Sequence, residues 1–190
     1  SLEYVGDTPA YIADLVAEHR GIMGLVPLMG DGLEAQLDQF FELAGKHGLD
    51  CDLHVDESDD PAARTLEQVA RAALRTGFRG RVTCGHCCSL AVQPEADAGE
   101  VLDLLAEADI AIVSLPMCNM YLQDRHAGRT PRWRGVTLLH EMRARGIEVA
   151  VASDNTRDPF YAYGDLDLVE VFREAVRILH LDHPFGDWPA

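Results

Sequence analysis

The sequence lacks a hydrophobic run of the about 20 residues that a membrane-spanning helix needs, and it is poor in basic residues. Its 16 lysines and arginines stand against 32 aspartates and glutamates, which gives a formal net charge of −16. Such a surface repels phosphate backbones and anionic lipids. We therefore expect neither nucleic acid nor a membrane among the partners.

The first residues, SLEYVGDTPA, have neither the basic start nor the apolar stretch of a signal peptide. A disulfide framework is also missing. The chain has five cysteines, an odd number, and three of them crowd at positions 84, 87 and 88. Because small secreted domains pair their cysteines in regular frameworks, this usage predicts a cytoplasmic protein with reduced thiols.

No linker rich in proline or glycine divides the chain, which predicts one domain over residues 1–190. Apolar runs rich in β-branched residues alternate with amphipathic stretches. The predicted strands cover 21–29, 49–57, 81–87, 109–116 and 147–154, and the predicted helices cover 8–19, 32–47, 61–76, 94–108, 137–145 and 165–180. This βα repeat predicts parallel strands joined by right-handed crossovers. An open doubly wound sheet and part of a (β/α)8 barrel both fit such an α/β pattern.

Residues suited to metal binding or proton transfer stand at the ends of three predicted strands. His54 and Glu57 close the second strand, His86 closes the third, and Asp154 closes the fifth. In both architectures the chemistry lies at the carboxyl ends of the strands. A single histidine at a strand end is more often structural. Histidines or carboxylates at the equivalent ends of three parallel strands favour one shared site. Strict alternation separates His54 from Glu57, so we expect the chain to turn between them.

The stretch RVTCGHCCSL admits three interpretations. Cys84 and Cys87 match the C-x-x-C spacing of thiol oxidoreductases, but there the first cysteine opens a helix, whereas Cys84 falls inside a strand pattern. A structural zinc site needs a second pair of ligands, and Cys51 and Cys118 are isolated. The favoured interpretation is a strand that delivers His86 to a site, with the cysteines as small packing residues.

The order of several motifs resembles the cytosine deaminase-like branch of the amidohydrolase superfamily. The motifs are LHVDESDD, VTCGHCCSL, LPMCNMYLQDR, TPRWRGV and VAVASDNTRDPFYAYGD, from about Gly21 to the end of the chain. The resemblance implies a TIM-type (β/α)8 barrel with one divalent metal ion, zinc or iron, at its mouth. The chain then supplies about five parallel βα units, with the first strands missing.

The resemblance also implies roles for single residues. His54 is the metal ligand from the fifth barrel strand, and Asp154 is the ligand from the eighth, which also takes a proton from the attacking water. Glu57 carries protons to the ring nitrogen of the substrate. His86, on the sixth barrel strand, holds and polarises the attacking water or the tetrahedral intermediate.

Two further residues are expected to contact a small heterocyclic substrate. Phe160 stands where the family places an aromatic ring near the bound base, and Asn155 follows the metal-binding aspartate. Members specific for cytosine can carry an acid at the position of Asn155. The expected substrate is therefore a pyrimidine, triazine or similar ring, and not cytosine in particular.

The chain departs from the family in what it lacks. None of its eight histidines forms the His-x-His pair that supplies two metal ligands from the first barrel strand. A full barrel takes roughly 250 residues. We expect a carboxyl-terminal portion of a deaminase barrel that binds metal weakly and has little or no activity alone. Its unpaired strand edges predict a homo-oligomer. Two alternatives stay open: a non-catalytic partial barrel that serves in assembly, and a thiol oxidoreductase that uses Cys84 and Cys87.

Overall fold

A single parallel sheet organises the chain, whose computed structural model describes residues 8–182. The five strands lie in the order β1-β2-β3-β4-β5, so every strand neighbours the next one along the sequence. All four pairings are parallel. The strands are β1 (Met23–Leu25), β2 (Cys51–Val55), β3 (Val82–His86), β4 (Ile110–Ser114) and β5 (Val149–Val151).

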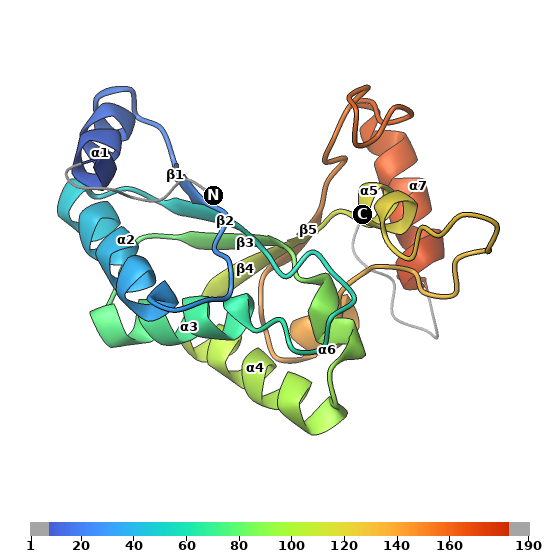
Figure 1. The fold of residues 1–190 in the computed structure, drawn as a ribbon, viewed down its shortest axis with the longest axis horizontal. Helices are drawn as coiled ribbons and strands as arrows, with labels where there is room; N and C mark the ends of the chain where they lie inside the picture. Colours follow the sequence, from blue (N-terminus) through green and yellow to red (C-terminus); the bar gives the residue numbers. More distant parts are fainter. Residues whose placement is uncertain (1–7, 183–190) are drawn as a thin grey trace.

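Helices cover one face of this sheet. Figure 1 shows α2, α3 and α4 side by side beneath the strands, while α5 and α7 lie together beyond β5. The helices are α1 (Thr8–Glu18), α2 (Leu33–His47), α3 (Thr65–Thr76), α4 (Glu95–Glu107), α5 (Pro116–Leu122), α6 (Leu139–Ala144) and α7 (Leu168–Leu179), with a 3₁₀ helix η1 (Cys88–Val92) after β3. None of the helices within residues 8–182 is long and apolar enough to cross a membrane.

The apolar periodicity of the sequence explains this layering. Helix α2 buries Leu37, Phe40, Phe41 and Ala44, which recur at helical spacing. It ends at Gly48, whose φ of 63° suits glycine and lets its backbone N–H bond to the carbonyl of Ala44.

The two faces of β2 differ sharply. Cys51, Leu53 and Val55 are buried against the helices, whereas Asp52 and His54 are exposed on the other face. In a closed (β/α)8 barrel that second face lines the interior. Sequential parallel strands with helices on one face confirm the predicted partial barrel.

The structure corrects two predicted boundaries. The strand predicted over 109–116 ends at Ser114, and the following segment, predicted as loop, forms α5, because Pro116 at its first position is preorganised for a helix. The helix predicted from Pro61 begins only at Thr65. Its first turn is fixed there because the Asp56 carboxylate accepts hydrogen bonds from Thr65 and Leu66.

Candidate active site

Three strand ends turn sharply into the site. Asp56, His86 and Asp154 follow or end β2, β3 and β5 with φ values of 50°, 71° and 65°. Residues other than glycine rarely adopt this left-handed backbone conformation, and such backbone strain is concentrated at functional sites. The turn expected between His54 and Glu57 lies at Asp56, and it brings both side chains to the same end of the sheet.

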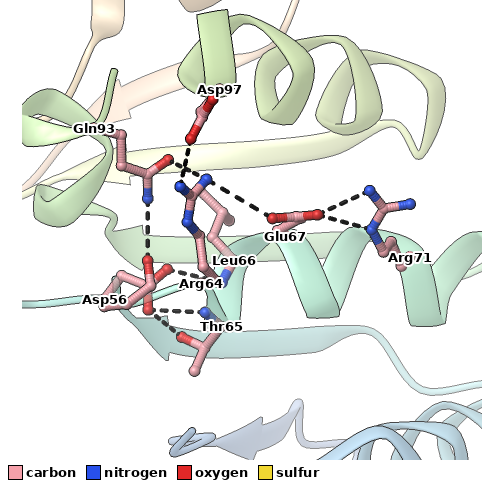
Figure 2. Close-up of polar contacts among 9 residues, drawn as sticks. Asp56, Arg64, Thr65, Leu66, Glu67, Arg71, Gln93 and Asp97 are labelled. Atoms are coloured by element: carbon pink, nitrogen blue, oxygen red, sulfur yellow. Dashed lines mark hydrogen bonds and ion pairs between the residues drawn. The ribbon is translucent and has the colours of Figure 1, made fainter. Parts of the chain in front are cut away.

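Asp56 anchors that turn to the neighbouring elements. One of its carboxylate oxygens accepts from the Thr65 N–H at 3.0 Å and the Thr65 hydroxyl at 2.5 Å, and the other accepts from the Leu66 N–H at 2.9 Å (Figure 2). Its backbone carbonyl accepts from the N–H of Ser89 at 3.0 Å. The ends of β2, α3 and η1 are thus tied together directly beside Glu57.

Figure 2 also shows the ion pairs that surround the start of α3. Arg64 donates to Asp97 at 2.7 Å and to Gln93 at 3.1 Å, and Arg71 pairs with Glu67 at 2.8 Å. The contacts of Arg64 join the start of α3 to the start of α4 and hold the loop that leaves the site after Glu57. The pair of Arg71 and Glu67 lies within α3.

The predicted site residues converge around His86. The Nδ1 atom of His54 lies 2.9 Å from Nε2 of His86, and Oε1 of Glu57 lies 3.4 Å from Nδ1 of His86. Glu57, His86 and Asp154 form a group whose potential ligand atoms all lie within 4.8 Å of one another. His86 is 2% exposed, Asp154 is half-buried, and the Glu57 side chain is 36% exposed.

Helix α5 adds a residue that was not predicted. Asn119 is completely buried, and its Nδ2 atom lies 2.9 Å from Oε1 of Glu57 and 2.9 Å from Nδ1 of His86. Gln123, one turn later, donates to the backbone carbonyl of Glu57 at 3.2 Å. The only signal in the sequence was that Asn119 lies inside LPMCNMYLQDR, one of the motifs that carry the resemblance.

Burial and charge shift the proton affinities in this group. Burial, reinforced by the Asp154 carboxylate, raises the pKa of Glu57 to about 7, although the hydrogen bond from Asn119 opposes the shift. Burial lowers the pKa of His86, and proximity to His54 adds to that effect. Glu57 is therefore set to exchange protons near neutral pH, as a general acid must.

The donor set fits a divalent metal ion. Histidine nitrogens and carboxylate oxygens are ligands for zinc and iron. The Oδ2 atom of Asp154 is buried and has no hydrogen-bond partner within residues 8–182, so it is an acceptor in need of a cation or donor. His54, the other predicted ligand, lies outside the group of three but touches it through His86.

Asn155 and Phe160 lie in the loop after β5. The Asn155 amide donates to Asp158 at 2.6 Å and accepts from the Cys118 thiol at 3.3 Å. Asp158 also accepts from the backbone N–H of Phe160, whose side chain is 62% exposed. Their roles as substrate contacts stay predictions.

All five thiols are free and buried. Burial raises the pKa of Cys51 to about 12, and it also raises the pKa values of Cys84 and Cys87. Cys84 lies within β3 and not at a helix start. A reactive thiol needs a lowered pKa, so this environment opposes the oxidoreductase alternative.

Asp124, in the LQDR motif, organises the long loop after α5. Its carboxylate accepts from the backbone N–H groups of Arg132 and Trp133 and pairs with the Arg129 side chain. These hydrogen bonds, that from Arg132 foremost, lower the pKa of Asp124. The motif therefore holds the shape of the loop that borders Asn119 and Gln123.

With this geometry in view, the chain can be compared with known proteins. Residues 6–190 match the sequence model of the Amidohydrolase family. The chain belongs to the amidohydrolase family. It is 65% identical over 178 residues to a pterin deaminase from Rhizobium rhizogenes, and 26% identical over 140 residues to an N-isopropylammelide isopropyl amidohydrolase from a Pseudomonas species.

A solved structure shares the fold. The 5-methylcytosine deaminase from Klebsiella pneumoniae, liganded with phosphonocytosine, superposes with a TM-score of 0.83 at 28% identity. The match covers 97% of this chain and 45% of that protein. The matches to the pterin deaminase and the Pseudomonas amidohydrolase cover 92% and 74% of this chain but 41% and 31% of those proteins. This chain therefore spans less than half the length of each of these three proteins.

Proposed function

We propose that this chain forms the carboxyl-terminal half of the catalytic barrel of a hydrolytic deaminase that acts on an amino-substituted pyrimidine ring, with pterin as the first candidate. The observation that carries the proposal is the convergence of Glu57, His86 and Asp154 within 4.8 Å at the carboxyl ends of the strands. The identity of 65% to a protein described as a pterin deaminase supports the choice of substrate.

The reaction replaces an exocyclic amine by oxygen. A water oxygen bonds to the ring carbon that bears the amine, the carbon–nitrogen bond breaks, and ammonia leaves. Glu57, with a pKa of about 7, can hold a proton on its carboxyl group and give it to a ring nitrogen, where it stays in the product. Asp154 can take one proton from the attacking water and pass it to the leaving amine, and the second water proton restores the Glu57 carboxyl group. His86 beside it offers a neutral ring, because burial lowers its pKa, and its Nδ1 and Nε2 atoms face Asn119 and His54.

His54 and Asp154 would hold one zinc or iron ion, which lowers the pKa of a bound water toward neutrality. The Asp154 carboxylate also repels charge on Glu57 and so favours its protonated form. These residues supply two ligands, fewer than the three protein ligands typical of a catalytic zinc site. We therefore expect the chain alone to show little or no turnover.

A chimera tests the proposal. The 178 matching residues of the R. rhizogenes pterin deaminase are replaced by this chain, and ammonia release from pterin and cytosine is measured with added Zn²⁺ or Fe²⁺. We expect the chimera to release ammonia from pterin, and both a D154N chimera and the isolated chain to fail. A folded chimera without turnover, or robust turnover by the isolated chain, contradicts the proposal.

The sheet edges support association of the chain with itself. Within residues 8–182, β1 pairs only with β2 and β5 only with β4, so each leaves one edge without a strand partner. Ile22 and Val26, which flank β1, are 59% and 63% exposed. Unpaired edges with apolar flanks favour pairing with another chain. We expect a homo-oligomer by light scattering, and a monomer at all concentrations tested contradicts this.

A further inference from the structure

The side-chain amide of Asn119 joins two residues of the candidate site. Its Nδ2 atom lies 2.9 Å from Oε1 of Glu57 and 2.9 Å from Nδ1 of His86. We propose that Asn119 is a positioning residue, which holds the Glu57 carboxyl group beside the His86 ring and keeps the His86 proton on Nε2, facing His54. The part that concerns catalysis rests on the proposed function, whereas the part that concerns the His86 ring does not.

The direction of the hydrogen bonds follows from the chemistry of an amide. An amide nitrogen carries two hydrogens and accepts no hydrogen bond, so the atoms that face it must be acceptors. Oε1 of Glu57 and Nδ1 of His86 therefore each offer a lone pair. A neutral imidazole has one N–H, so the proton of His86 lies on Nε2, 2.9 Å from the Nδ1 atom of His54. One directional series of hydrogen bonds thus links Asn119, His86 and His54.

The backbone keeps the amide in place. Asn119 lies in the middle of α5, where its N–H bonds to the carbonyl of Leu115 and its carbonyl accepts from the N–H of Gln123. The side chain of Gln123 donates to the backbone of Glu57, so α5 is attached to the strand end at a second point. Helix α5 also packs against α7. The amide therefore stays beside Glu57 and His86.

Burial of Asn119 is costly, which points to a role beyond packing. The residue is 0% exposed, and its Oδ1 atom has no hydrogen-bond partner within residues 8–182. An unpaired buried acceptor carries a desolvation penalty, which an apolar side chain at this position would avoid. Buried polar groups that lack a hydrogen-bond partner are concentrated at functional sites.

Three substitutions separate positioning from packing. N119D keeps the shape but replaces the donor by acceptors, so Nδ1 of His86 must gain a proton. N119L keeps the bulk of the side chain and removes its hydrogen bonds, so the proton of His86 no longer prefers Nε2 over Nδ1. M120A is the matched control, because Met120 lies on the same helix and is 43% exposed.

The readout is the ¹⁵N NMR spectrum of the histidine rings in the 190-residue chain. We expect the proton on Nε2 of His86 in the wild type and in M120A, a proton on Nδ1 in N119D, and a mixture of both forms in N119L. A wild type with the proton on Nδ1, or an N119D variant that keeps the wild-type pattern, overturns the proposal. If N119D does not fold, the wild-type and N119L spectra still test whether Asn119 keeps the proton of His86 on Nε2.

Turnover in the chimera tests the link to catalysis. A mispositioned general acid should cost at least about tenfold in kcat, since such groups contribute about 10²–10⁴-fold. We expect N119L to lower kcat by that factor while KM changes less than about threefold, and M120A to match the unsubstituted chimera. An unchanged kcat in N119L overturns the positioning role. An inactive unsubstituted chimera contradicts the proposed function, whereas the NMR result on His86 remains valid.

Discussion

The Nδ1 atom of His54 lies 2.9 Å from the Nε2 atom of His86, although the two residues are 32 positions apart in the sequence. In the ladder of β2 and β3, His54 pairs with Gly85, whereas His86 pairs with Val55, whose side chain faces the helices. Alternation alone would therefore place the two histidines on opposite faces of the sheet. The φ of 71° at His86 turns the chain and directs its ring toward His54. Backbone strain at one residue thus creates the centre of the site.

The first prediction concerns metal binding by the isolated chain. Removing a ligand leaves the remaining donors too few to hold the ion, so H54Q and D154N should each bind Co²⁺ or Zn²⁺ at least about tenfold more weakly than the wild type. Isothermal titration and the absorption of bound Co²⁺ measure the affinity. H19Q is the control, since His19 is exposed at the end of α1. Equal affinity in all variants would place the metal elsewhere.

The second prediction concerns the pH dependence of stability in the metal-free chain. The folded pKa of Glu57, about 7, lies above its usual value of 4.5, because burial and Asp154 disfavour its charge. A raised pKa means that the folded state holds the proton more tightly than the unfolded state. The stabilisation from this group is therefore complete below about pH 4.5 and is lost as the pH rises to about 7.

The change E57Q should remove this contribution, because glutamine does not titrate. Urea unfolding at several pH values should show a smaller loss of stability between pH 4.5 and 7 in E57Q than in the wild type. E42Q serves as the control, since Glu42 is exposed on α2. Parallel curves for the wild type and E57Q would show that Glu57 titrates normally.

The apolar periodicity of the sequence predicted most of the fold. Alternation of apolar β-branched runs with amphipathic stretches placed all five strands, and helix α2 buries the face that its pattern predicts. Helix α5 was missed because seven residues are too few for a helical period to stand out from an apolar run. The start of α3 was misplaced because its first turn depends on Asp56, which is distant in sequence.

The site was predictable only in part. The grouping of His54, Glu57, His86 and Asp154 could be predicted because chemistry in parallel α/β folds lies at strand ends, a rule that needs no coordinates, and their roles stay predictions. Asn119 could not be found by that rule, because it lies on a helix and meets Glu57 across 62 residues of sequence. Such contacts depend on tertiary packing, which a pattern along the chain does not encode.

The third prediction concerns the cysteines. Thiolates react with alkylating and disulfide reagents, and burial that raises the pKa suppresses them. Under native conditions at pH 8, we expect the five thiols to react at least about tenfold more slowly than in urea, including Cys118, whose pKa burial raises to about 12. Mass spectrometry after timed alkylation measures each site. Rapid native labelling of Cys84 or Cys87 would restore the oxidoreductase alternative.

The last prediction concerns Asp56, whose carboxylate accepts three hydrogen bonds at the start of α3. Loss of a side chain that caps a helix costs about 0.5–2 kcal/mol. Because D56A also releases the turn that carries Glu57, we expect a loss near the top of that range, about 2 kcal/mol, in urea unfolding of the isolated chain. D59A is a matched control, since Asp59 is an exposed acid three residues later, and it should change stability by less than about 0.5 kcal/mol. Amide exchange at Thr65 and Leu66 should accelerate in D56A alone. Equal stability of D56A and the wild type would mean that α3 begins without help from this carboxylate, and the strand end would then need another explanation for its fixed geometry.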